Sequence, residues 1–407
     1  MSRPAVVINA RLLDPASRLD VKGGLLIVGG RIAELGPQVS VSLAPGGAEV
    51  IDARGLCLAP GLVDMRVQLG EPGAEHKERI DSGAAAAAAG GVTSMAVLPN
   101  TDPPIDDPAM VEFVARRARQ VKLGKVYPYA AITKQLKGEE LAEIGLLKAA
   151  GAVAFTDGER ALANARVMRR ALTYARDFDA LVVHHTEDPH LVGEGVMNEG
   201  EFAARLGLVG VPKAAETIML ERDLRLVALS ESRYHAASLT CAESLDVLLR
   251  GKELGLAITA AASINHLTLN EMDVGAYRTF CKVSPPLRPE ADRTALVAAL
   301  ASGLIDVVMS DHNPQDVETK RLPFAEAEPG AIGIETMLTA ALRLVHAGDI
   351  KLMTLLKATS SRPAEILGLP GGNLRPGSPA DVIVVDLDVP WVLDREELKS
   401  KCKNSPF

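Results

Sequence analysis

Six polar residues stand at the ends of short apolar segments, where their side chains could act together. They are Arg66, Gln68, Asn100, Asp157, His185 and Asp311. Histidine and aspartate side chains bind zinc or transfer protons. A guanidinium is always charged and donates hydrogen bonds without accepting any, so Arg66 suits a small anion and repels a metal ion. Each residue alone could cap a loop, but six at equivalent places predict one shared site.

The apolar segments that carry these residues alternate with amphipathic helical stretches such as 107–122. The expected buried strands cover residues 95–100, 125–132, 151–157, 180–188, 258–263 and 305–311. Strand–helix alternation over roughly 300 residues predicts an α/β fold, a (β/α)8 TIM-type barrel. A doubly wound sheet is the alternative, but no GxGxxG follows the first strand. In a barrel the carboxyl ends of the strands share one face, which would bring the six residues together.

Both ends of the chain have the pattern of short strands separated by turns. Residues 5–14 alternate like a strand, the Gly29-Gly30 pair predicts a hairpin, and residues 375–393 have the same character. We therefore expect a small β-sandwich domain made from both termini, residues 1–55 plus 360–407. The barrel would occupy residues 56–359.

Composition excludes several classes of protein. The 407 residues carry a net charge of −8, which argues against a nucleic-acid partner because phosphate binding needs a basic face. The four cysteines form no CxxC pair, so neither a zinc knot nor a disulfide framework is expected. No apolar stretch is long enough for a signal core or a membrane span. The prediction is a cytoplasmic protein without a membrane anchor.

Several motifs together resemble one family. They are "APGLVDMRVQLGEPG" (59–73), "PNTDPP" (99–104), "VVHHTEDPHLVGEGVMNEG" (182–200), "PPLRPEADR" (285–293) and "IDVVMSDHNPQ" (305–315). Their order and spacing are similar to the dihydroorotase branch of the amidohydrolases across essentially the whole chain. The resemblance implies a (β/α)8 barrel with a β-sandwich. It also implies the reversible closure of carbamoyl aspartate to dihydroorotate by zinc-activated water.

The chain departs from the family pattern at most of the positions that the resemblance marks as functional. The departures are Arg66 and Gln68 for the two histidines of the first strand, Gly70 for a carboxylate-clamping arginine, Gly158 for an aspartate, Ser238 for a histidine, Ser284 for an asparagine and Gln315 for a histidine. Asn100, Asp157, His185 and Asp311 are kept. Both the metal ligands and the substrate clamp have therefore changed.

A hydrolytic zinc centre needs about three protein ligands. Of the expected set only His185 and Asp311 are left, so no metal and no cofactor are expected, and Asp311 would be a vestigial catalytic residue. Arg66 is predicted to enter the vacated metal site and pair with Asp311. His184 and His312 are predicted to face away from the lumen, and His266 to have a packing or loop role. His235 matches the first half of the family's histidine pair and lies too early in its strand to act as the ligand.

Three functions follow from this pattern. The leading one, by resemblance to pseudo-dihydroorotases, is a catalytically inactive structural subunit that binds aspartate carbamoyltransferase catalytic chains and forms a homo-oligomer. The first alternative is an active dihydroorotase or related cyclic amidohydrolase with an atypical metal site, which would hold zinc. The second is a metabolite-binding regulatory protein. Asn100 and Arg66 are the predicted substrate-binding or anion-binding residues.

Overall fold

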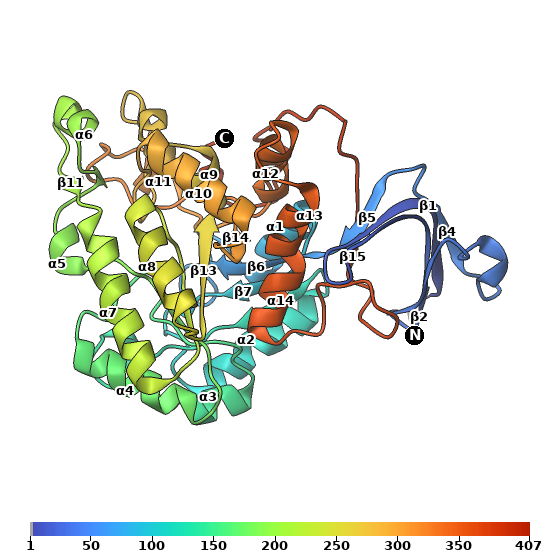
Figure 1. The fold of residues 1–407 in the computed structure, drawn as a ribbon, viewed down its shortest axis with the longest axis horizontal. Helices are drawn as coiled ribbons and strands as arrows, with labels where there is room; N and C mark the ends of the chain where they lie inside the picture. Colours follow the sequence, from blue (N-terminus) through green and yellow to red (C-terminus); the bar gives the residue numbers. More distant parts are fainter. Residues whose placement is uncertain (1–2) are drawn as a thin grey trace.

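The computed structural model describes residues 3–407 and contains a closed ring of parallel strands, so the predicted barrel is confirmed (Figure 1). Its regular strands are β6 (Leu62–Val67), β7 (Val92–Val97), β8 (Lys125–Pro128), β9 (Val182–His184), β12 (Tyr234–Ala236), β13 (Ile258–Ser263) and β14 (Val307–Met309). Phe155 bridges Ala130 and Val182, so it stands in for a strand between β8 and β9. A bridge from His312 to Val67 closes the ring.

Helices follow most of the strands and cover the outside of the barrel, as Figure 1 shows. The longer helices are α1 (Ile80–Ala89), α2 (Pro108–Val121), α3 (Ile144–Ala150), α4 (Ala165–Arg176), α7 (Ala214–Ser230), α8 (Ala242–Glu253), α10 (Glu290–Ser302) and α12 (Met337–His346). The shorter ones are α5 (Pro189–Val192), α6 (Glu201–Leu206), α9 (Ile264–Thr268), α11 (Val317–Lys320), α13 (Leu352–Leu356) and α14 (Arg362–Leu367). A two-stranded ladder of β10 (Met197–Asn198) and β11 (Gly210–Val211) lies in the loop region between α5 and α7.

Local sequence explains where these elements begin. In α2 the side chain of Asp107 accepts a hydrogen bond from Ala109 N, and Pro108 fills the first turn, where its missing N–H costs nothing. The strands of the barrel are short and apolar because both of their faces are covered; every residue of β6 is buried.

A curled six-stranded sheet lies beside the barrel at the right of Figure 1. Its strands are β1 (Ala5–Asp14), β2 (Leu19–Val28), β3 (Arg31–Gly36), β4 (Glu49–Asp52), β5 (Cys57–Pro60) and β15 (Val382–Val385). Gly29 and Gly30 join β2 to β3 with φ values of 61° and 75°. Two successive positive φ angles fit a tight hairpin turn that glycine adopts without strain, so the predicted hairpin is confirmed.

The division between the two domains differs from the predicted boundaries. The sheet continues to Pro60, past residue 55, and the C-terminal part of the chain adds only β15 to it. The last residues return to the barrel, where Asn404 contacts the loop after β14. The chain therefore crosses between the domains more often than expected.

Two further observations concern the cysteines and the membrane. The four cysteines are free and buried. Within residues 3–407, no helix combines the length and the apolar character that crossing a membrane requires.

Candidate active site

Arg66 and Asp311 form a buried ion pair at the carboxyl end of the barrel. Nε of Arg66 donates to Oδ1 of Asp311 at 2.7 Å, and the two residues are 3% and 8% exposed. The register of β6 against β7 shifts between Asp64 and Val67, which indicates a bulge that re-aims Arg66. Asp311 has a φ of 52°, a left-handed conformation that is uncommon outside glycine, although aspartate adopts it more readily than most residues. The predicted pairing of these two residues is confirmed.

Asp64 ties the two strands of this pair together. Its Oδ1 accepts hydrogen bonds from Arg66 N at 3.2 Å and from Ser310 N at 3.3 Å. Complete burial raises the pKa of Asp64 to about 6, although these hydrogen bonds oppose the rise. The backbone on both sides of the ion pair is thereby fixed.

Asn100 fills the space beside Gly158. Gly158 has a φ of 70°, and a Cβ on it would collide with Oδ1 of Asn100. The position at which the resemblance expects a metal-binding aspartate therefore has neither the backbone conformation nor the room for a side chain. Oδ1 of Asn100 is buried and has no hydrogen-bond partner within residues 3–407.

The position expected to carry the carboxylate-clamping arginine is also closed. The N–H of Ala74 donates to the carbonyl of Gly70 at 2.5 Å, and a Cβ on Gly70 would collide with the carbonyl oxygen of Ala74. Ser284, at the expected asparagine position, donates its hydroxyl hydrogen to Oε2 of Glu187 at 3.2 Å. The family's clamp therefore has no equivalent at these two positions.

His185 is held by Glu187. Its Nε2 lies 3.2 Å from Oε2 of Glu187, while its Nδ1 is buried and unpaired among the described residues. Burial alone would raise the pKa of Glu187. The hydrogen bond and charge of His185, together with the charge of Arg288, outweigh burial, so the pKa of Glu187 lies below its usual range. An ionised Glu187 fixes Nε2 as the protonated nitrogen and leaves a lone pair on Nδ1.

A chain of hydrogen bonds, here called the polar bridge, joins three loops at this end of the barrel. Lys77 Nζ donates to Gln315 Oε1 at 2.7 Å, Gln315 Nε2 donates to Asn313 Oδ1 at 2.9 Å, and Asn313 Nδ2 donates to Glu159 Oε1 at 2.7 Å. Asn404, near the end of the chain, donates to Asn313 O at 3.2 Å. Burial raises the pKa of Glu159, although the charge of Arg66 opposes the rise.

The remaining histidines serve the scaffold. His184 lies on the helix-facing side of β9, where its Nδ1 is 2.6 Å from Asp223 of α7 and its Nε2 accepts from Leu162 N at 2.8 Å. His235 pairs with Thr259, and His266 with Ser263 and the carbonyl of Pro285. These contacts confirm the predicted orientation of His184 toward the helices and the predicted packing role of His266.

The structure brings Arg66, Asp311 and Asp64 into one cluster, with Asn100 after the neighbouring strand β7. His185 follows β9, which is adjacent to neither β6 nor β14 in the ring. Asp157 instead accepts hydrogen bonds from the backbone of Ile132 and Thr133 and from the hydroxyl of Thr133, so it supports a loop. Five residues of the site escaped the prediction: Asp64, Lys77, Glu159, Glu187 and Asn313. Only Glu187 could have been suggested by the sequence, because a residue two positions after His185 on an extended segment projects to the same side.

The residues of this site do not fit a zinc centre of the family type. Within residues 3–407 no three His, Cys, Asp or Glu side chains are grouped so that they could hold a metal ion. His185 and Asp311 are engaged by Glu187 and Arg66. The guanidinium lies against the carboxylate that would bind the ion, and it would repel a divalent cation.

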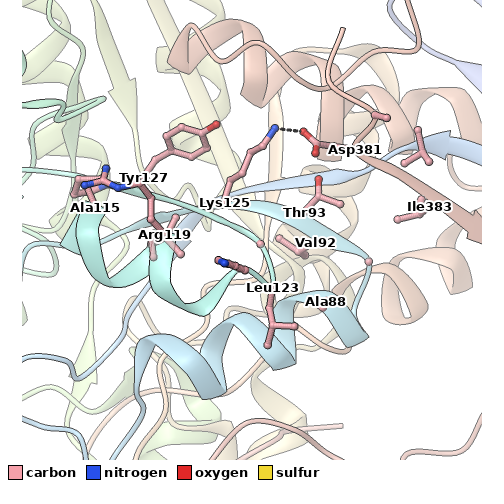
Figure 2. Close-up of a pocket in the computed structure, with 18 of the residues that line it drawn as sticks. Ala88, Val92, Thr93, Ala115, Arg119, Leu123, Lys125, Tyr127, Asp381 and Ile383 are labelled. Atoms are coloured by element: carbon pink, nitrogen blue, oxygen red, sulfur yellow. Dashed lines mark hydrogen bonds and ion pairs between the residues drawn. The ribbon is translucent and has the colours of Figure 1, made fainter. Parts of the chain in front are cut away.

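The pocket in Figure 2 is a separate feature at the opposite end of the strands. It has a volume of about 770 Å³ and lies where β7 and β8 begin and β15 passes. Lys125 forms an ion pair with Asp381 beside it. None of the six strand-end residues lines this pocket, so it does not belong to the candidate site.

Comparison with known proteins identifies the family. A dihydroorotase of Geotalea daltonii is 44% identical over 399 residues, which cover 98% of this chain and 93% of that protein. This chain belongs to the dihydroorotase-like amidohydrolase family. A family profile described as "Dihydro-orotase-like" matches residues 55–244. The dihydroorotase of Ehrlichia chaffeensis is 39% identical over 402 residues, covering 98% of this chain and 90% of that protein.

Solved structures agree on the fold. L-Hydantoinase (dihydropyrimidinase) from Arthrobacter aurescens matches with a TM-score of 0.89 at 24% identity, covering 100% of this chain and 92% of that one. D-Hydantoinase from a Thermus species matches with a TM-score of 0.81 at 23% identity, covering 98% and 90%. At this level of identity the likeness establishes the barrel with its β-sandwich and no more.

These comparisons overturn the leading functional prediction. Similarity over nearly the whole chain to proteins named dihydroorotase favours an active enzyme over a catalytically inactive structural subunit. The prediction was wrong because it gave a few replaced positions more weight than similarity spread over about 400 residues. The prediction that no cofactor is needed is overturned with it, since the dihydroorotase reaction was expected to use zinc.

Proposed function

We propose that this chain is a cyclic amidohydrolase of the dihydroorotase class, acting at the barrel end that carries Arg66, His185 and Asp311. The supporting observation is the similarity to dihydroorotases over 98% of the chain. The site lies at the carboxyl ends of the strands, where enzymes with this fold keep their catalytic residues.

His185 has the arrangement of a general base in this proposal. Hydrolysis of a cyclic amide requires that water lose a proton and that the ring nitrogen gain one. With Nε2–H donated to Glu187, Nδ1 of His185 can accept the proton from water, and the carboxylate of Glu187 stabilises the imidazolium that forms. The same imidazolium can return the proton to the leaving nitrogen.

The side chains of the site do not fit a zinc centre, whereas the relatives are named dihydroorotases, whose reaction is expected to use zinc. The decisive experiment therefore measures activity and metal content on one sample. Purified protein is assayed for ring opening of dihydroorotate, with and without added zinc, and its metal content is determined by mass spectrometry. His185→Ala is compared with His190→Ala, which removes an exposed histidine of the same segment.

We expect turnover by the wild type and a loss of about 10²- to 10⁴-fold in kcat/KM for His185→Ala, the usual contribution of a general base. His190→Ala should match the wild type. No ring opening above the buffer rate, with or without zinc, would overturn the proposed function. Equal rates for His185→Ala and the wild type would overturn the role of His185. Association with aspartate carbamoyltransferase chains and homo-oligomer formation stay predictions.

A further inference from the structure

Arg66 has an unused donor face. Its Nε is occupied by Asp311, but Nη1 and Nη2 are both buried and have no hydrogen-bond partner among residues 3–407. Buried donors are almost always paired in proteins, so two free N–H-bearing nitrogens on one 3%-exposed guanidinium need an explanation. The end of a guanidinium presents its two Nη groups side by side, a spacing that matches the two oxygens of a carboxylate.

The two positions at which the family resemblance expects substrate recognition cannot bind a carboxylate in the same way. The turn at Gly70 leaves no room for a side chain, and Ser284 is committed to Glu187. Dihydroorotate carries a carboxylate on its ring, so an enzyme that selects it needs a cation in the site. Asp311 neutralises part of the charge of Arg66 through Nε and fixes the plane of the guanidinium, which orients the Nη face.

We propose that the Nη1 and Nη2 groups of Arg66 bind the carboxylate of a cyclic amide substrate, with Asn100 beside them as a polar neighbour. Leu98 N donates to Val67 O at 2.9 Å, so the ends of β6 and β7 lie next to each other and carry Arg66 and Asn100 to the same part of the site. This inference rests on the proposed function and names the residue that sets the substrate class. Arg66 thus takes over the carboxylate recognition that the family resemblance assigns to other positions.

The polar bridge lies close to Arg66. Glu159 is the acidic member of the bridge, and the charge of Arg66 acts on it. Asn313, not Arg66, donates the hydrogen bond to Glu159. A substrate carboxylate can therefore bind the guanidinium without displacing an existing ion-pair partner.

The test compares two ligands that differ only in the carboxylate. Binding of dihydroorotate and of dihydrouracil, which is the same ring without the carboxylate, is measured by isothermal titration calorimetry at fixed pH and salt. Arg66→Lys keeps a positive charge opposite Asp311 and removes the paired Nη groups. Arg117→Lys is the matched control, because Arg117 also pairs through Nε with a carboxylate, that of Glu71, and lies outside the site.

The wild type and Arg117→Lys should prefer dihydroorotate by about 10- to 100-fold, the usual effect of a charge-assisted pair of hydrogen bonds. Arg66→Lys should reduce that preference to a few-fold. An unchanged preference in Arg66→Lys, or no preference in the wild type, would overturn the inference. If Arg66→Lys does not fold, a crystal structure of the wild type with dihydroorotate decides. Carboxylate oxygens about 3 Å from Nη1 and Nη2 support the inference, and a carboxylate elsewhere overturns it.

Turnover measured on the same samples separates this inference from the proposed function. If the protein hydrolyses dihydroorotate but its preference for dihydroorotate over dihydrouracil does not depend on Arg66, the carboxylate-binding role of Arg66 is wrong and the proposed function stands. If binding depends on Arg66 but no hydrolysis occurs, the binding role stands and the proposed function is wrong.

Discussion

Oδ1 of Asn100 occupies the space into which a Cβ on Gly158 would project. Gly158→Asp, which restores the residue type expected from the family, should therefore destabilise the protein by about 1–3 kcal/mol through overpacking and an unfavourable positive φ. Chemical denaturation measures this. Asn100→Gly combined with Gly158→Asp should recover the part that is due to overpacking. A Gly158→Asp variant as stable as the wild type would contradict the collision.

His184 fastens the loop that carries Glu159. The imidazole accepts from Leu162 N and pairs with Asp223, so His184→Ala leaves the buried Leu162 N without this acceptor and removes one of several partners of Asp223. The expected loss of stability is about 1–3 kcal/mol for the unpaired Leu162 N–H. Calorimetric unfolding measures the loss, and His190→Ala should have little effect. Asp223 keeps its hydrogen bonds to Tyr234 and Arg222, which limits its contribution to the loss of stability in His184→Ala.

His235 should make stability depend on pH. Burial lowers the pKa of His235 to about 4, from an ordinary value of 6.5. Asp306 opposes the shift, whereas Arg362 and Lys252 add to it. Between these two pH values the unfolded chain binds more protons than the native protein, so stability rises with pH from about 4 to about 6.5 and is lost on acidification.

The loss attributable to this histidine is about 3 kcal/mol between pH 6.5 and pH 4. His235→Asn removes the titrating group, so the slope of unfolding free energy against pH should be shallower in that window than in the wild type. Urea denaturation at several pH values provides the measurement, with His190→Ala as the control. Identical slopes in His235→Asn and the wild type would show that the shift is absent.

Asn313 is the centre of the polar bridge. Asn313→Ala breaks its hydrogen bonds to Glu159 and Gln315, so the loops after Phe155 and after β14 should open more often. Backbone hydrogen exchange of residues 157–163 and 312–316 should accelerate by about 10-fold, which corresponds to the loss of roughly one hydrogen bond. Asn373→Ala, near the β-sandwich, should leave these segments unchanged. Unaltered exchange in Asn313→Ala would show that the bridge does not restrain the loops.

The fold was predictable because its signals are local and repeated. Apolar segments followed by amphipathic helices gave the barrel, and the Gly29-Gly30 pair gave the hairpin. The domain boundaries were less accessible, since the return of Asn404 to the barrel depends on contacts between residues about 90 positions apart.

At the site, the Arg66–Asp311 pair could be predicted because a cationic arginine replaces a histidine expected in the first strand, while the aspartate at the end of the last strand is kept. The polar bridge could not be predicted, because Lys77, Asn313 and Glu159 meet only after three loops have folded. The function was mispredicted for a different reason. Residue types at single positions describe the local chemistry, whereas family membership is a property of the whole chain.

The tight turn at Gly70 also constrains how this protein can change. Replacing Gly70 by arginine would place a side chain against the Ala74 carbonyl, so this one substitution would not restore the clamp expected from the family. The backbone of the turn would have to change as well. We therefore expect substitutions around Arg66 to alter carboxylate recognition more readily than a substitution at Gly70.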